Sequence, residues 1–203
     1  MRRFFTLLLV LTLCIPSVFA QSKAKEMLAE IEGKYTLDDN GGVSFVSYIE
    51  VPGMSKDDIF MRAQNYFVYK YGYGKAVIQT QDKDLGVLVG KGVYDNVHVG
   101  SSMIMTEVDA WHILRVDAKE GKARVIITLT GYEKDITSMN GEKSHGDFVS
   151  IASQYPFNPK GGQKTIMSKA FYKSYQAAME SLDGVEKAIK EGNTAKAIEN
   201  ADW

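Results

Sequence analysis

The sequence predicts an α+β protein, in which a curved antiparallel sheet packs against one long helix near the C-terminus. From Thr165 to Leu182 the apolar residues recur at the three-and-four spacing of an amphipathic helix about 27 Å long. Much of the chain before this helix alternates apolar and polar residues, which is typical of strands with one buried face. We therefore expect the sheet to curl around the helix.

Residues 1–20 have the features of a signal peptide. Arg2 and Arg3 precede an apolar core from Phe4 to Ile15, and Val18-Phe19-Ala20 predicts cleavage before Gln21. The apolar core is too short to span a bilayer as a helix. We predict export to the periplasm, with secretion or a place on the cell surface as alternatives.

Cleavage would remove the only thiol of the chain and change its net charge. The only cysteine, Cys14, would be removed, which excludes a disulfide or a cysteine-bound metal in the mature protein. Loss of Arg2 and Arg3 from the 24 basic residues would leave 22 against 25 acidic ones, a formal charge of −3. Nucleic acid is therefore not an expected partner, since its binding requires a basic surface. No later apolar run is long enough for a transmembrane segment.

Residues 21–42 are expected to form a short helix followed by a turn. Ser22 to Glu32 carries apolar residues on one helical side, and the run from Asp38 to Gly42 is a strong turn signal. Val43 to Val51 is rich in β-branched and aromatic residues, which predicts a strand that ends at Pro52-Gly53. This strand opens the main domain, for which we expect the boundaries 43–182.

A helix should follow this first strand. Ser55 and Asp58 form a pair that resembles a capping box, and Gly72 and Gly74 mark the helix end. Alternating patterns then predict four strands, and the short polar links between them favour antiparallel pairing. The third of these strands is long enough to require a bulge. The four strands are Lys75–Gln81, Gly86–Val93, Met103–Ala118 and Ala123–Gly131.

Ser138 to Gln163 is the least regular segment. Asparagine, glycine and proline residues mark turns within it, so it is either a functional loop or a strip that covers the sheet edge. We expect the long helix to end at Asp183-Gly184. Residues 183–203 would then form a separate, weakly helical tail.

The chain contains the motifs Val51-Pro52-Gly53, Ser55–Phe60, Arg62-Ala63, Ala76–Gln79, Asp82-Lys83, Gly86, Gly90-Lys91-Gly92 and Val116–Arg124. These motifs resemble those of one bacterial family, the domain of unknown function 4468. The resemblance spans roughly residues 43–131, and it implies a TBP-like fold with a curved antiparallel sheet and helices in the order given above. Family members are exported proteins of Gram-negative bacteria without an assigned activity. The first helix often carries a Trp where this chain has Tyr66.

The three histidines, His98, His112 and His145, are the candidate catalytic groups. His112 lies in phase with the apolar side of its strand, whereas Glu107 and Asp109 lie on the opposite side and cannot readily orient it. We therefore expect a core or groove-edge histidine. The three histidines show no short pairing typical of zinc ligands, so we expect neither a metal nor a cofactor. An envelope hydrolase that uses a histidine and a carboxylate stays open as an alternative.

The aromatic residues favour binding over catalysis. Five aromatic side chains fall within residues 66–73, too many for the buried face of one helix. We predict a non-catalytic binding or interaction module of the cell envelope, whose partner is a small apolar ligand or an envelope protein. The expected ligand-binding residues, at an open end of the core, are Tyr66, Trp111, Tyr132 and Phe171. A structural assembly subunit that docks through residues 138–163 or the tail is a further alternative.

Overall fold

The computed structural model describes residues 23–39, 41–101, 104–154 and 164–192. The predicted signal peptide and the last eleven residues of the predicted tail lie outside these ranges. After a helix over residues 23–31, eight strands and three further helices follow. They are β1 (Thr36–Leu37), β2 (Val43–Glu50), α2 (Lys56–Lys75), β3 (Ala76–Asp82), β4 (Val87–Ser101), β5 (Met105–Lys119), β6 (Lys122–Thr137), β7 (Lys143–His145), β8 (Val149–Ser150), α3 (Ile151–Gln154) and α4 (Lys164–Glu191).

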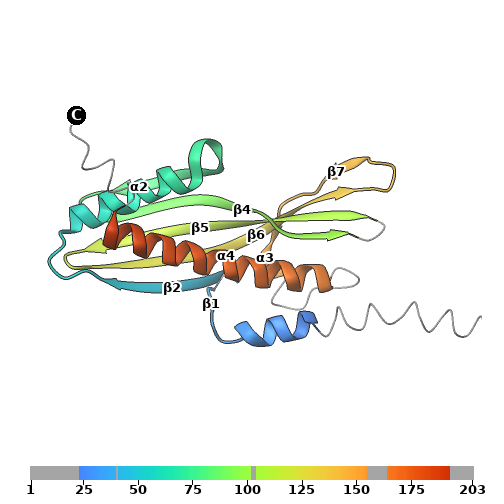
Figure 1. Ribbon diagram of the computed structural model, residues 1–203, viewed down its shortest axis with the longest axis horizontal. Coiled ribbons are helices and arrows are strands. Elements are labelled where there is room, and N and C mark those ends of the chain that lie inside the picture. The colour runs from blue at the N-terminus through green and yellow to red at the C-terminus, as the bar shows by residue number, and fades with distance from the viewer. Residues whose placement is uncertain (1–22, 40, 102–103, 155–163, 193–203) are drawn as a thin grey trace, which may run out of the picture.

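The eight strands form one antiparallel sheet, in which six follow the order β1-β2-β6-β5-β4-β3 and the short strands β7 and β8 each pair with β6. Its centre is the long β5–β6 hairpin, which turns at Gly121. In Figure 1, α4 lies in front of the strands along the length of the sheet, and α2 packs near β3 and β4. The predicted α+β architecture, with a long C-terminal helix on the sheet, is confirmed.

The core lies between the helices and one face of the sheet. Along β5 every second side chain is buried, from Val108 to Ala118, and these residues pack with Met167 and Phe171 of α4. Such period-two burial is the expected consequence of a strand with one covered face. Each large apolar side chain in this layer contributes about 1.5–3 kcal/mol of transfer free energy to folding. We call the covered side of the sheet the inner face and the opposite side the outer face.

The register between β5 and β6 shifts by one residue in the middle of the hairpin. Trp111 pairs with Gly131 and His112 with Leu129, so Thr130 is the extra residue of β6. Its hydroxyl donates a hydrogen bond to the Trp111 carbonyl over 3.2 Å. The bulge expected within the third predicted strand, which corresponds to β5, thus lies in its partner β6, and the buried side of β6 continues from Leu129 to Tyr132.

The expected end of the long helix at Asp183-Gly184 was wrong. α4 runs without a break to Glu191, and the buried Val185, Ala188 and Ile189 belong to the core. A Cβ atom at Gly184 would lie 3.0 Å from the Tyr66 ring, so the glycine lets α2 and α4 approach closely. Tertiary packing here outweighs the low helix propensity of glycine, which costs only about 1 kcal/mol relative to alanine.

The irregular segment after β6 covers part of the sheet edge. β2 pairs with β6 from Lys122 to Leu129, and β8 and β7 pair with its remainder from Gly131 to Thr137. Ile151 of α3 inserts into the core and is 1% exposed. The described part of this segment is thus the edge-covering strip, one of the two alternatives that the sequence left open.

Candidate functional site

Three of the four predicted ligand-binding residues lie inside the core. Tyr66 is 6% exposed, and Tyr132 and Phe171 are fully buried. Trp111 lies on the outer face, because it precedes the inward-facing His112 in the strand. The expectation that these four side chains line one open end of the core is therefore wrong, because Trp111 and the other three lie on opposite sides of the sheet. Whether any of them binds a ligand stays a prediction.

The centre of the outer face is apolar and partly exposed. Ile113 of β5 is 37% exposed and Val46 of β2 is 43% exposed, while Trp111 and Ile126 are half-buried beside them. The Lys91 ammonium lies 4.4 Å from the centroid of the Trp111 ring, within the range of a cation–π interaction. Among the described residues, no acceptor bonds the buried Trp111 Nε1. We call Trp111, Ile113, Val46 and Ile126 the apolar centre.

One end of the outer face is basic and is organised around Asp117. This carboxylate accepts hydrogen bonds from Arg115 Nε at 2.7 Å and from Arg124 Nη2 at 2.5 Å. Burial raises the pKa of Asp117, but the two guanidinium groups outweigh burial and hold it below its usual value. Lys119, Lys122 and the acidic Glu50 lie beside this group. A cavity of about 300 Å³ is lined by Tyr48, Glu50, Asp117, Lys119, Lys122, Ala123 and Arg124.

The opposite end of the outer face is acidic. Glu107 pairs with Asp135, and Asp109 pairs with Glu133, so cross-strand neighbours carry like charges. Burial raises the pKa of Asp109, and the carboxylates Asp95, Asp135 and Glu133 raise it further, against a 2.6 Å hydrogen bond from the Asn96 amide.

The histidines occupy three different environments. His112 is fully buried and stacks on Tyr94 with a centroid separation of 3.9 Å, and burial lowers its pKa to about 4. The expected core histidine is thus found. The pKa of His98 is lowered by burial and by Lys169 and Lys173. Within the described ranges, no group of three or more His, Cys, Asp or Glu side chains has the geometry of a metal site.

His145 is exposed at the acidic end, where its Nδ1 contacts the Asp135 carboxylate. The hydrogen bond and the charge of Asp135 raise the pKa of His145. The two residues are ten positions apart and meet only because β7 pairs with β6. Sequence reasoning missed this contact, and the Asn140-Gly141 turn between the two strands was the available signal for the hairpin.

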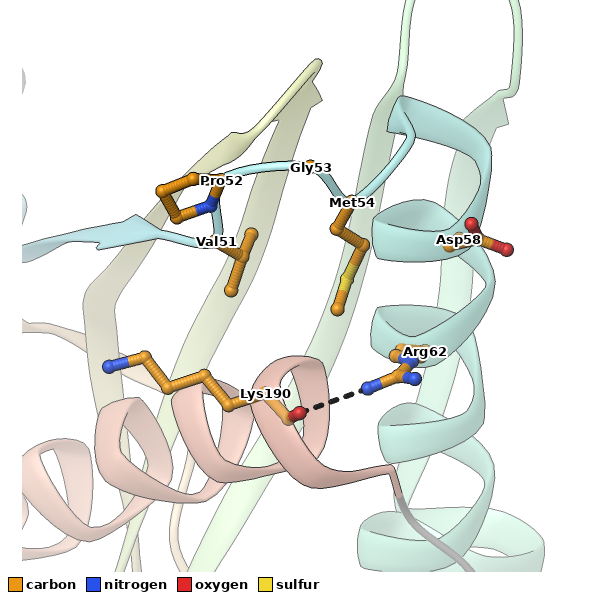
Figure 2. A pocket seen from close by; sticks show the side chains of 7 residues that line it. All are labelled: Val51, Pro52, Gly53, Met54, Asp58, Arg62 and Lys190. Atoms are coloured by element: carbon orange, nitrogen blue, oxygen red, sulfur yellow. Dashed lines mark hydrogen bonds between the residues drawn. The ribbon is translucent and has the colours of Figure 1, made fainter.

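A depression of about 470 Å³ lies where the β2–α2 connection meets the C-terminal end of α4 (Figure 2). Arg62 of α2 donates hydrogen bonds to the carbonyls of Ile189, at 2.8 Å, and Lys190, at 3.1 Å. These carbonyls are among the last in α4, where a cation favourably opposes the helix dipole. The lining residues are Val51, Pro52, Gly53, Met54, Asp58, Arg62 and Lys190.

The lining of this depression also holds the fold together. The Val51 amide donates to the Gly121 carbonyl at 2.8 Å, and the Gly121 amide donates to the Met54 carbonyl at 3.0 Å. The Lys56 ammonium reaches the Asp84 carbonyl at 2.8 Å. These hydrogen bonds join the β2–α2 connection to the turns of two hairpins. The residues of this connection therefore have a structural role that requires no ligand.

No helix within the described residues is both long enough and apolar enough to cross a membrane. The class of protein defined by this geometry is an α+β domain with a helix-covered antiparallel sheet. Within it, residues 45–133 match the family model described as "Domain of unknown function (DUF4468) with TBP-like fold". The resemblance expected from the sequence is confirmed over these residues.

Two solved structures share the fold. The chain is similar to a DUF4468 family protein from Bacteroides ovatus, with a TM-score of 0.53 and 18% identity, over 81% of this chain and 95% of that one. It is also similar to a TBP-like protein from Parabacteroides distasonis, with a TM-score of 0.55 and 12% identity, over 77% and 97% of the two chains. At these identities the likeness shows the fold alone. No match is found among curated proteins.

Proposed function

We propose that this protein is an exported, non-catalytic interaction module of the cell envelope and that its contact surface is the outer face of the sheet. The observation that carries the proposal is the apolar centre, in which Trp111 and Ile113 lie on the side of β5 that none of the described helices covers. Apolar patches ringed by polar groups mark interaction sites more often than chance exposure does. Tryptophan is also among the residues that most often dominate binding energy.

Site-specific photo-crosslinking in cells tests this surface. A photoreactive residue in place of Ile113, which is 37% exposed, should form adducts with the partner. The matched control replaces Met61, which is 52% exposed on α2, away from the outer face. Mass spectrometry of the adducts would distinguish a protein partner from a small apolar ligand. Adducts at the Met61 position and none at the Ile113 position would overturn the proposal.

Export is a separate part of the proposal, and it is supported by the signal-peptide features of residues 1–20. The protein recovered from a periplasmic fraction should begin at Gln21, as measured by the mass of its N-terminal peptide. Recovery of the uncleaved N-terminus from the cytoplasm would contradict export and leave the surface assignment intact.

The contact between His145 and Asp135 favours a second candidate, an envelope hydrolase. A carboxylate can orient a histidine that acts as a general base. This pair is exposed, at 70% and 48% of the two side chains, so water would screen it. A hydrolase that uses this pair should lose its activity in His145→Ala, while a hydrolytic activity that survives the substitution would retire this candidate.

A further inference from the structure

The two ends of the outer face carry opposite charge, and the apolar centre separates them. Arg124 and Asp117 form one cross-strand pair at the basic end, and Asp135 and Glu107 form another at the acidic end. On β5, Glu107 and Asp117 of these two pairs are ten residues apart, which corresponds to about 34 Å along the strand. Trp111 lies between them. Charges at the two ends therefore cannot pair within one molecule.

This arrangement is complementary to itself. A two-fold axis can lie between two facing copies and cross the strands between Ile113 and Trp111. Such an axis sets β5 over β5 and β6 over β6 with reversed directions. The register then places Arg115 opposite the second copy's Asp109, and Arg124 opposite its Asp135. It also places Asp117, whose charge is already paired with Arg115 and Arg124, opposite the second copy's Glu107. Trp111 lies opposite Ile113 in both halves, as an isologous contact requires.

We propose that the outer face binds a second copy of this chain, in a face-to-face dimer with antiparallel strands. This inference rests on the proposed function, because it names the partner of the same surface. The patch covers about 34 Å along the strands and roughly 19 Å across four of them, a projected area of roughly 650 Å². That is of the order of the ~800 Å² that each partner contributes to a standard interface.

Charge selects the orientation of the two copies. With strands in the same direction, the acidic ends would meet and repel, as would the basic ends. Reversal brings each acidic end to a basic end and leaves Trp111 and Ile113 of the two copies in contact, while Ile126 lies opposite Glu133. The resulting interface has an apolar core and a charged rim, the usual anatomy of a specific protein contact.

Exchange of charges tests the dimer directly. Sedimentation velocity on the chain that begins at Gln21 should show a dimer whose dissociation constant rises with salt. R124E and D135R should each weaken dimerisation at least about tenfold, because each places like charges opposite one another. An equimolar mixture of the two variants should recover a heterodimer, since both rim contacts then join opposite charges again.

Two charge reversals outside the outer face serve as matched controls. K164E and D183R alter exposed residues of α4 and should leave the dissociation constant unchanged. Thermal unfolding of every variant, followed by circular dichroism, verifies that each one is folded. Recovery in the mixture also requires folded partners, so misfolding cannot imitate it.

Two results would overturn the dimer. One is a monomer at about 100 μM, well above the micromolar dissociation constants of the weakest interfaces of this size. The other is a mixture of R124E and D135R that stays monomeric while both variants are folded. If a photoreactive residue at position 113 still captured another envelope protein, the dimer would be wrong and the proposed function would stand. The absence of any adduct at that position would overturn both.

Discussion

The two faces of the same sheet are built from the same strands but have opposite chemistry. On the inner face of β5, Val108, Ala110, Leu114 and Val116 are at most 1% exposed and pack against the helices. On the outer face, the intervening positions carry Glu107 and Asp109 at one end, Arg115, Asp117 and Lys119 at the other, and Trp111 between them. Burial leaves the inner face little choice of residue type, because an unpaired charge there is too costly. The outer face has no such constraint, so the segregation of its charges calls for another explanation.

Removal of a large inner side chain should have the largest effect on stability. Phe171→Ala deletes a ring that is fully buried between α4 and the sheet and that contacts Tyr35 edge-on at 5.4 Å. We expect a loss of about 3–5 kcal/mol in the free energy of unfolding, from lost transfer energy and the cavity left behind. Urea unfolding measures it. A loss under about 1 kcal/mol would show that the inner face is not the close-packed layer described above.

His112 should make stability depend on pH. Its pKa is about 4 in the folded protein and near 6.5 when unfolded, so the unfolded chain binds the proton more readily. The folded state should therefore have its full stability above pH 6.5 and lose about 3 kcal/mol as the pH falls to 4. Urea unfolding at a series of pH values measures this loss. In His112→Gln the slope between pH 6.5 and 4 should flatten, and an unchanged slope would assign it to other groups.

Trp111→Ala should separate stability from association. Because the ring is half-buried on the outer face, we expect a loss of only about 1 kcal/mol in the free energy of unfolding. The dimer dissociation constant should rise by at least about 30-fold, as for a central interface residue. Paired denaturation and sedimentation experiments compare the two quantities. A loss of stability as large as that of Phe171→Ala, with unchanged association, would reverse the roles assigned to the two faces.

Asp117→Asn should have the smallest effect. The carboxylate is 12% exposed, but its two arginine partners are nearly half exposed, so solvent screens the pairs. We expect a loss of about 0.5–1 kcal/mol near neutral pH. Because the folded-state pKa lies below its usual value, this contribution should fade as the pH falls below about 4. Urea unfolding at pH 7 and pH 3 measures both values, and a larger difference between variant and wild type at pH 3 would contradict the stated sign.

Local pattern was enough to predict much of the fold. Period-two alternation identified the buried side of β5, and the three-and-four spacing in Thr165–Leu182 identified the helix that covers it. Both signals are local because the geometry of a strand or helix repeats over a few residues. The burial of His112, one of the two placements expected for it, is in phase with the same alternation.

The residues of the candidate site were less accessible to sequence reasoning. Trp111 was grouped with Tyr66, Tyr132 and Phe171, which the fold places on the other side of the sheet or within the core. The contact of Lys91 with Trp111 depends on the pairing of β4 with β5. A pairing register joins segments far apart in the chain, and no local pattern reports it.

By itself, then, the sequence determined which side chains of each strand must be buried, since the hydrophobic effect acts on every residue through its own local period. Tertiary structure alone decided that α4 continues through Gly184. Tyr66 of α2 packs so closely against this position that a side chain there would collide with its ring. Tertiary structure also decided that Arg124 and Asp135 mark opposite ends of one face, because strand pairing sets their positions. The apolar pattern specifies burial, and long-range pairing specifies which charges share a surface.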